Sequence, residues 1–374
     1  MSAALAQVRR VNAHRTAGVR RFEEADIPQV AALHQRCWPD GVGVQRSYRG
    51  YFTEVFLENP AQRGPARSLV YHESDGRIVG FLGIVPRRMA MGGRHVEAAV
   101  SSQFIVDPAS AVGLVALKLS KTFLEGPQDV SIADEANDVS RIIWEGLGGT
   151  TARLLSLYWT RPLRPAGLAL SYLRGRRPFA PLATVAQPFA RLADACAARL
   201  PGSHFRQSRP AVPPCDLYVH EVLASVPQLG EAALRVEHDE RNFQWLLDRA
   251  AGRRGARRLL TGALKDGRTM AGWYIAVLDR DGVAEVAQVA ATPSSIHDVL
   301  DHLFHHAWRE GALAATGRME PRFMQALSDR YCLFHRRGPW VLVKARYPEL
   351  VRPFETGDAW FSPFDGEWSL RFQG

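Results

Sequence analysis

One stretch sets the fold of this chain: Val96-Glu97-Ala98-Ala99-Val100-Ser101-Ser102-Gln103-Phe104-Ile105-Val106-Asp107-Pro108. Apolar and small residues alternate along it up to Val106, which predicts a β-strand. Pro108 ends the strand, because proline has no N–H to donate to a neighbouring strand. A loop of small residues, Ala109 to Gly113, then leads into an apolar run from Leu114 to Phe123 that we expect to be helical.

A second strand and a second helix follow directly. The strand extends from Asp129 to Asp134, and an amphipathic pattern predicts a helix from Glu135 to Glu145. Gly146 and Gly148 follow this helix, and glycine commonly ends helices. The order is strand, proline, small-residue loop, helix, strand, helix and glycine, which indicates an α/β unit.

This order resembles the core of the GNAT N-acyltransferase superfamily. In the second helix, Asn137, Ser140, Trp144 and Gly148 have the spacing of the family's Asn-x-x-Ala-x-x-x-Tyr-x-x-x-Gly helix, with two substitutions. The resemblance implies a mixed α/β sheet whose first strand carries the thioester of an acyl-CoA. It also implies that the loop after this strand holds the pyrophosphate.

The composition is that of a globular protein that can bury sizeable cores. The chain has 374 residues, enough for two ordinary domains, of which 46% are hydrophobic and 23% charged. No apolar run reaches the roughly 18 residues of a membrane span, and the N-terminus has no hydrophobic signal core, so we expect a cytoplasmic protein. The four cysteines are scattered, which predicts reduced, buried thiols.

The net charge of +9 comes from an excess of arginine, with groups of arginines at residues 9–21, 174–177 and 253–258. Such groups can bind the phosphates of nucleic acids or of anionic membranes, and they also favour a phosphate-bearing cofactor. A solvated surface is the simpler explanation. We therefore expect no nucleic-acid partner.

The second half of the sequence repeats features of the first half in the same order. Three features recur: Ile27-Pro28-Gln29-Val30 as Val226-Pro227-Gln228-Leu229, Asp75-Gly76-Arg77 as Asp266-Gly267-Arg268, and the strand before Pro108 as the strand before Pro293. Three repeats in one order predict a duplicated unit.

We therefore expect two tandem GNAT-like domains. The first covers residues 1–161 and ends with a strand from Ala152 to Trp159. A proline-rich, partly helical connector follows at residues 162–215, because so many prolines exclude a central sheet. The second domain covers residues 216–374 and ends in an aromatic tail, Asp358 to Phe372, that we expect to form terminal strands.

The resemblance also implies the residues that bind the acyl donor. In GNAT proteins the first strand parts from its parallel neighbour, and this frees backbone N–H groups for the thioester and the pantetheine arm. The expected cofactor-binding residues are the backbone of Phe104, Ile105 and Val106, the loop residues Ser110, Val112, Gly113 and Leu114, and the helix residues Asn137, Ser140 and Trp144.

The loop keeps only part of the family's pattern, in which a basic or amide residue comes first and a small residue last. Gly113 is kept, whereas Ser110 and Val115 occupy the first and last positions. The expected donor is therefore acetyl-CoA or another acyl-CoA, or an acyl group on a carrier protein, for which no nucleotide need be held.

Transfer of an acyl group to an amine needs a base for the amine and stabilisation of the leaving thiolate. Asp134 and Glu135, at the carboxyl end of the second strand, are the first candidates for the base, and Glu97 is a further one. Trp144 replaces the family's tyrosine, and an indole N–H is not an acid in this range. Either the sulfur is protonated through water or another residue, or this half does not catalyse.

We expect the first domain to bind the donor and the second to be degenerate, because its loop from Pro293 to Asp298 lacks glycine. The second domain would then form a wall of the acceptor site. The histidines between His297 and His306 indicate a polar helix face, so no metal site is expected.

The expected function is N-acyltransfer, with acetyl as the first choice of acyl group, from a CoA thioester to the amine of a small molecule. Two alternatives remain open. One is a Fem-type transferase that uses aminoacyl-tRNA, and the other is a catalytically silent binding or scaffold protein.

Overall fold

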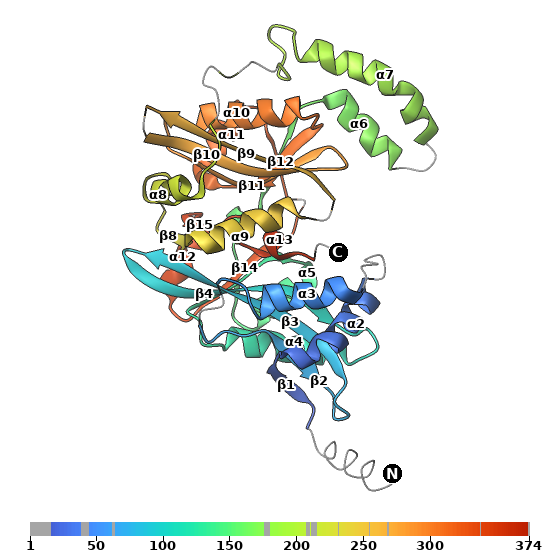
Figure 1. Cartoon of the computed structure of the whole chain (residues 1–374), viewed down its shortest axis with the longest axis vertical. Coiled ribbons are helices and arrows are strands. Elements are labelled where there is room, and N and C mark those ends of the chain that lie inside the picture. The colour runs from blue at the N-terminus through green and yellow to red at the C-terminus, as the bar shows by residue number, and fades with distance from the viewer. Residues whose placement is uncertain are drawn as a thin grey trace. The chain divides into compact units, whose positions relative to one another are not determined.

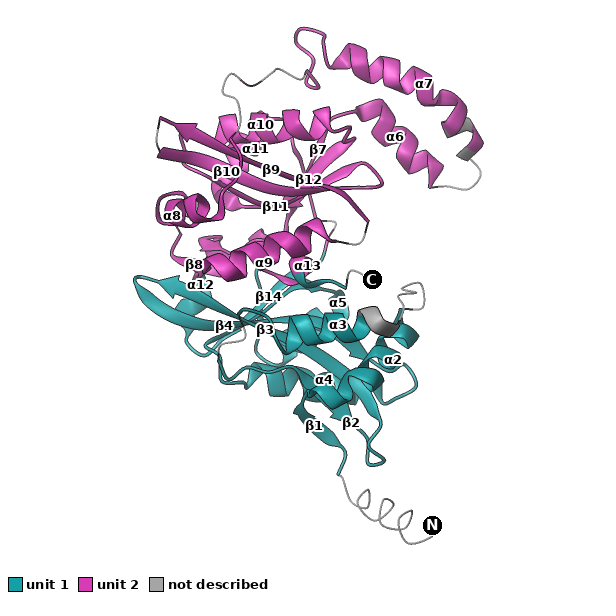
Figure 2. Ribbon diagram, viewed as in Figure 1, with its two compact units in different colours: residues 1–152, 339–352, 370–374 teal, residues 153–338, 353–369 magenta. Residues whose placement is uncertain are grey.

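The computed structural model describes residues 16–38, 45–61, 64–175, 180–206, 210, 215–230, 232–253, 255–267, 269–336 and 338–372. Its residue contacts divide the chain into two compact units (Figure 2). Unit 1 comprises residues 1–152, 339–352 and 370–374, and unit 2 comprises residues 153–338 and 353–369. Each unit has a mixed sheet with helices on its faces, which confirms the expected α/β class.

The sheet of unit 1 has the strand order β1-β2-β3-β4-β5-β14-β6 (Figure 1). These strands are Gly18–Arg21 (β1), Leu69–His72 (β2), Ile78–Met91 (β3), Arg94–Val106 (β4), Val130–Ala136 (β5), Thr150–Thr151 (β6) and Trp340–Ala345 (β14). Neighbouring strands are antiparallel except β4 and β5, which are parallel.

Helices cover both faces of this sheet. They are α2 (Ile27–Cys37), α3 (Gln45–Phe56), α4 (Val112–Leu124) and α5 (Asp138–Gly146), with a 3-10 turn at Glu24–Asp26 before α2. Two glycines of β3 show the two faces, since a Cβ at Gly80 would meet Val115 of α4 and a Cβ at Gly83 would meet Phe56 of α3. Glycine at both positions therefore lets a helix approach the strand closely.

The sheet of unit 2 has the order β13-β7-β12-β11-β10-β9. Its strands are Tyr158–Pro162 (β7), Ala256–Asp266 (β9), Thr269–Asp279 (β10), Val283–Ala291 (β11), Ala314–Arg318 (β12) and Leu333–His335 (β13). Within it, β11 and β12 are parallel and the other neighbours antiparallel. A short parallel pair in the same unit joins β8 (Leu234–Glu237) to β15 (Ala359–Trp360).

Helices lie on both faces of this sheet too, with α8 and α9 on one face and α10 on the other. The described helices of unit 2 are α6 (Pro165–Arg174), α7 (Ala180–Ala197), α8 (Val219–Leu229), α9 (Glu240–Ala251), α10 (Ile296–Arg309), α11 (Met324–Asp329), α12 (Arg352–Thr356) and α13 (Glu367–Leu370). Alternation along β10 separates two cores. Tyr274 and Ala276 pack in the core with α10, while Trp273 and Ile275 pack in the core with α8 and α9.

The same order of elements occurs in both units. Unit 1 has β2-β3-β4-α4-β5, and unit 2 has β9-β10-β11-α10-β12, with one parallel pair after the helix in each case. The duplication that the sequence predicts is therefore present in the fold.

The two sheets exchange strands along the chain. β7 follows β6 in sequence but pairs with β12 and β13 of unit 2, whereas β14 follows β13 but pairs with β5 and β6 of unit 1. The compact units consequently differ from the expected segments with limits at residues 161 and 216. The expected connector contributes β7, α6 and α7 to unit 2.

Two local predictions were wrong. The expected strand from Ala152 to Trp159 is a 3-10 turn at Leu154–Ser156 followed by β7, and the aromatic tail forms only β15 and α13 rather than a set of strands.

All four cysteines are free thiols as expected, but only Cys332 is buried, while Cys196 and Cys215 are exposed. Among the described residues, no helix combines the length and the apolar character needed to cross a membrane.

Candidate functional site

The parallel strands β4 and β5 part from one another halfway along β4. They pair from Ala98–Val130 to Val100–Ile132, and the pairing stops there although β4 continues to Val106. On its other edge, β5 pairs with β14 along its whole length, from Val130 to Ala136. All residues of these strands are described. From Ser101 to Val106, the edge of β4 that faces β5 therefore has no strand paired with it.

A β-bulge at Gln103 accompanies this parting. Ser102 pairs with Gly83 and Ile105 with Phe81, so that two residues of β4 lie opposite one residue of β3. Gln103 has a φ of +52°, which is rare for a residue with a side chain. Because a bulge bends and twists its strand, it accounts for the change in direction of β4.

A buried hydrogen bond holds Gln103 in this conformation. Nε2 of His34 lies 3.0 Å from Oε1 of Gln103, and an amide oxygen only accepts, so Nε2 carries the hydrogen. Burial lowers the pKa of His34, which keeps the ring neutral. Its Nδ1 is buried and has no hydrogen-bond partner among the described residues.

The backbone of β4 presents at least one donor to the groove between β4 and β5. The N–H of Asp107 donates to the carbonyl of Val79 on β3, at 2.8 Å. Successive N–H groups of a strand point to opposite sides, so the N–H of Val106 points into the groove. By the same alternation the N–H of Ile105, which pairs with Phe81, points toward β3. Ile105 is therefore not a donor of the expected kind.

The N-terminus of α4 offers two further N–H groups. Ser110 donates through its hydroxyl to the carbonyl of Asp107, and the N–H of Val112 donates to the carbonyl of Ser110, so the turn itself uses these groups. The first helical bond joins Val115 N–H to Ala111 O. Gly113 and Leu114, both exposed, precede it and have no acceptor within the helix.

Two arginines lie beside this turn. The carboxylate of Asp107 is buried and contacts Arg36 at 2.9 Å and Arg77 at 3.7 Å. The N–H of Ala109, followed by the Arg36 guanidinium, holds the pKa of Asp107 below its usual range. Both arginine side chains are nearly half exposed, and Arg77 also pairs with Glu73 at 2.7 Å.

The expected carboxylates do not all meet at the groove. Asp134 and Glu135 lie two and three residues after Ile132, where the parting begins. Asp134 is fully buried, and Glu135 forms an ion pair with Arg371. Glu97 is exposed and lies on the other side of the paired segment, where its N–H donates to Asp129. With a rise of about 3.3 Å per residue, Glu97 lies about 20 Å along the strand from Gln103.

The expected residues of α5 have structural roles. Asn137 is the N-cap of this helix and accepts a hydrogen bond from the N–H of Ser140 at 2.8 Å. Trp144 is 3% exposed and packs against Phe123 of α4, with ring centroids 5.9 Å apart. These three residues start α5 and fix it on α4.

Unit 2 contains a second parting of parallel strands. β11 and β12 pair from Val283–Ala314 to Val286–Gly317, and β11 then continues to Ala291 paired only with β10. β11 also has a register shift, between Val286 and Gln288. The two halves match in sequence here: Gln288 stands five residues before Pro293 as Gln103 does before Pro108, and Glu320 follows Gly317 as Glu135 follows Ile132.

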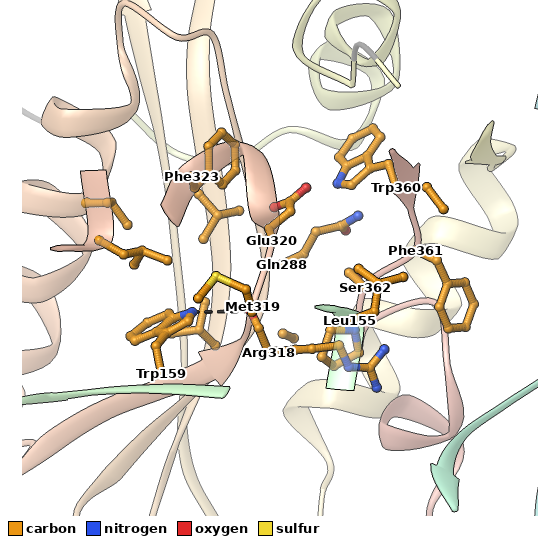
Figure 3. Close-up of a pocket in the computed structure, with 17 residues that line it drawn as sticks. Leu155, Trp159, Gln288, Arg318, Met319, Glu320, Phe323, Trp360, Phe361 and Ser362 are labelled. Atoms are coloured by element: carbon orange, nitrogen blue, oxygen red, sulfur yellow. Dashed lines mark hydrogen bonds between the residues drawn. The ribbon is translucent and has the colours of Figure 1, made fainter. Parts of the chain in front are cut away.

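In unit 2 the chain itself occupies the gap between these strands. The N–H of Phe364 donates to the carbonyl of Ala287 on β11, at 3.3 Å. A cavity of ≈ 40 Å³ remains beside Gln288, Glu320 and Trp360 (Figure 3). Oε1 of Gln288 and Nε1 of Trp360 are buried there without a partner among the described residues. Such a volume holds about three water molecules, far less than a pantetheine arm.

Glu320 is the carboxylate of this cavity. It pairs with Arg322 at 2.6 Å, and burial nevertheless raises its pKa. Among the described residues, no group of histidine, cysteine and carboxylate side chains is placed to hold a metal ion.

Sequence reasoning missed His34, Arg36 and the unit 2 residues Gln288, Glu320 and Trp360. The two glutamines carried a usable signal, because each stands five residues before the proline that follows its strand. His34 and Arg36 carried none, since a helix near the N-terminus gives no indication of which distant strand it contacts.

Comparison with known proteins supports the fold. No protein-family model matches the sequence, and no curated protein matches it. The GCN5-related N-acetyltransferases of Anabaena variabilis ATCC 29413 and of Kribbella flavida match in structure with TM-scores of 0.55 and 0.52, both at 13% identity. Each match covers 88% of this chain, and 72% and 71% of the respective solved chains.

The N-myristoyltransferase of Saccharomyces cerevisiae, whose crystal structures contain myristoyl-CoA, also matches. Its TM-score is 0.51 at 8% identity, over 88% of this chain and 80% of that one. Together with the repeated order of elements, these likenesses establish that the chain has the GNAT fold in two tandem units, as the sequence predicts.

Proposed function

We propose that this protein is an N-acyltransferase that moves an acyl group, acetyl in the first instance, from a CoA thioester to the amine of a small molecule. The parting of β4 from β5 after Val100 and Ile132 carries the proposal. It leaves a strand edge on which a main-chain donor faces a groove, as polarisation of a thioester carbonyl requires. Solved acyltransferases of the same fold add support.

The donor is proposed to lie along β4, with its pantetheine arm on the backbone of Phe104 and Val106. Its pyrophosphate would accept hydrogen bonds from the N–H groups of Gly113 and Leu114, where the helix dipole also favours an anion. Arg36 and Arg77 supply positive charge beside this turn. A donor on a carrier protein would use the β4 contacts alone.

The chemistry is an addition followed by an elimination. The neutral amine attacks the carbonyl carbon, a new C–N bond forms, and the C–S bond breaks as the thiolate leaves. Glu135, after release from Arg371, is the proposed base that takes the amine's proton, and Asp134 is the alternative. Because Trp144 lies in the core, the proposed proton for the sulfur comes through water.

Unit 2 is not proposed to hold a donor. Residues 360–364 occupy the gap between β11 and β12, and the remaining ≈ 40 Å³ is too small. This assignment agrees with the absence of glycine from its loop.

The test is release of the CoA thiol from acetyl-CoA in the presence of a panel of primary amines. Glu135→Gln should lower kcat/KM about 100-fold, because a neutral amide cannot accept the proton. Glu97→Gln is the matched control and should leave the rate unchanged, since Glu97 lies outside the groove.

Two results would count against this function. One is no thiol release from acetyl-CoA or longer acyl-CoAs with any amine, and the other is an equal rate for Glu135→Gln and Glu97→Gln. Loss in Asp134→Asn alone would move the base from Glu135 to Asp134.

A further inference from the structure

Helices α6 and α7 of unit 2 form a hairpin (Figure 2). A buried carboxylate near the end of α7 joins it to the start of α6. Asp194 of α7 is 7% exposed, and its two oxygens accept hydrogen bonds from the N–H groups of Ala166 and Gly167, at 2.8 and 2.9 Å. A carboxylate at a helix N-terminus is stabilised by the orphan N–H groups and the dipole. This contact fixes which face of α7 is turned toward α6.

The opposite face of α7 carries an apolar stripe. With about 100° of rotation per residue, Ala190 and Asp194 lie on the face toward α6 and the stripe lies on the far side. We define the α7 stripe as Val185, Phe189, Leu192 and Cys196. Their large side chains are 70% (Val185), 73% (Phe189) and 66% (Leu192) exposed, and Cys196 is also exposed. Leu200, in the turn after the end of α7, is 56% exposed.

The charge around the stripe has one sign. Residues 164–206 contain seven arginines and no lysine or glutamate, and their single aspartate is the buried Asp194. Four of these arginines are described as exposed: Arg174, Arg191, Arg199 and Arg206. Residues 164–206 thus present exposed arginines and an apolar ridge, and no carboxylate among their described residues is exposed.

We propose that the α7 stripe docks onto an anionic membrane surface. A helix with bulky apolar residues on one face and arginines beside them binds at the headgroup boundary, where the apolar side chains enter the lipid and the cations meet anionic headgroups. The stripe is a convex ridge on a single helix, which suits insertion into a deformable surface. The proposal is independent of the acyl-transfer reaction.

The test is co-sedimentation of the full chain with vesicles of phosphatidylcholine alone and of equimolar phosphatidylcholine and phosphatidylglycerol. The chain should sediment with the anionic vesicles only, and less so at high salt, because salt screens the arginines. The double variant Phe189→Ser/Leu192→Ser should bind at least about tenfold more weakly, since it removes the two central apolar side chains.

A matched control tests whether the loss of any two exposed apolar side chains lowers binding. Met324 and Leu333 of unit 2 are 53% and 61% exposed and lie outside the hairpin. Met324→Ser/Leu333→Ser should bind the anionic vesicles as the unchanged chain does. Equal loss in both double variants, or no binding of the folded chain to either vesicle, would overturn the proposal.

Cys196 allows insertion to be observed directly. In a Cys37→Ser/Cys215→Ser chain, a polarity-sensitive dye on Cys196 should shift to the blue with anionic vesicles. The same dye on Cys215, in a Cys37→Ser/Cys196→Ser chain, should not shift. If the Cys196 dye instead responds to protein concentration without vesicles, the stripe joins two copies of the chain. If it responds only to an acidic protein, its partner is a protein. Either result would replace the membrane assignment.

Discussion

Gln103 combines two unusual features, a left-handed backbone and a buried bond to His34. Both Gln103→Ala and Gln103→Gly lose this bond, but only alanine keeps a Cβ at a φ of +52°. We therefore expect the alanine variant to be less stable than the glycine variant by about 1 kcal/mol. Urea unfolding measures the difference. Equal stabilities would show that the bulge relaxes and that the groove does not depend on it.

His302 of unit 2 predicts a pH dependence of stability. It is 5% exposed, bonds to the hydroxyl of Tyr274, and has a pKa that burial, followed by His306 and His305, lowers to about 4. The unfolded chain binds this proton below about 6.5 and the folded chain only below about 4, so stability falls as the pH is lowered through this window.

The loss should reach up to about 3 kcal/mol by pH 4. Thermal unfolding between these pH values should therefore show a shallower dependence in His302→Gln than in the unchanged chain. Parallel curves would mean that other groups account for the acid sensitivity.

The parts of the site that follow from local patterns could be predicted at the level of residues. The alternation of apolar residues identifies the strand before Pro108, and proline and glycine, which determine the backbone conformation next to them, identify the turn after it. The position of the carboxylates after Ile132 follows from the end of the strand that precedes them. The His34–Gln103 bond joins residues 69 apart, and the direction of each N–H depends on the bulge. Neither feature follows from the nearby sequence alone.

At the scale of elements, a variant at the N-terminus of α4 distinguishes a CoA donor from a carrier-bound donor. Proline is tolerated in the first turn of a helix, so Gly113→Pro removes one N–H without breaking a helical bond. A Cβ at this position meets nothing within 4 Å. Gly113→Pro should weaken acetyl-CoA binding about tenfold and leave acetyl-pantetheine binding unchanged.

Gly113→Ala is the control, because it adds a side chain and keeps the N–H. It should bind acetyl-CoA as the unchanged chain does. If proline and alanine behave alike in a binding titration, the start of α4 does not hold the pyrophosphate.

Other elements were predicted only in part. The helices after Pro108 and after Asp134 were correct because amphipathic patterns identify them. The last strand of the first half was wrong, since β7 and β14 gain their hydrogen bonds from partners more than a hundred residues away in sequence. The residue pattern of a strand does not determine which other strands it pairs with.

At the scale of the whole molecule, the exchange of β7 and β14 makes each unit depend on the other half of the chain. A fragment of residues 1–161 lacks β14, which pairs with both β5 and β6. We expect it to unfold without a cooperative transition in circular dichroism. Joining residues 339–352 to it through a flexible linker should restore a transition. Cooperative unfolding of the fragment alone would mean that β14 is dispensable.

The most direct test of a donor site on the free edge of β4 is calorimetric titration of acetyl-CoA into the full chain and into Val106→Pro. The N–H of Val106 points into the groove and is not part of the β3–β4 ladder, so proline removes a proposed donor while the pairing remains. We expect the unchanged chain to bind acetyl-CoA, and Val106→Pro, with the same melting temperature, to bind it about tenfold more weakly. Equal binding by the two chains, or no binding of acetyl-CoA or longer acyl-CoAs by the unchanged chain, would contradict this expectation.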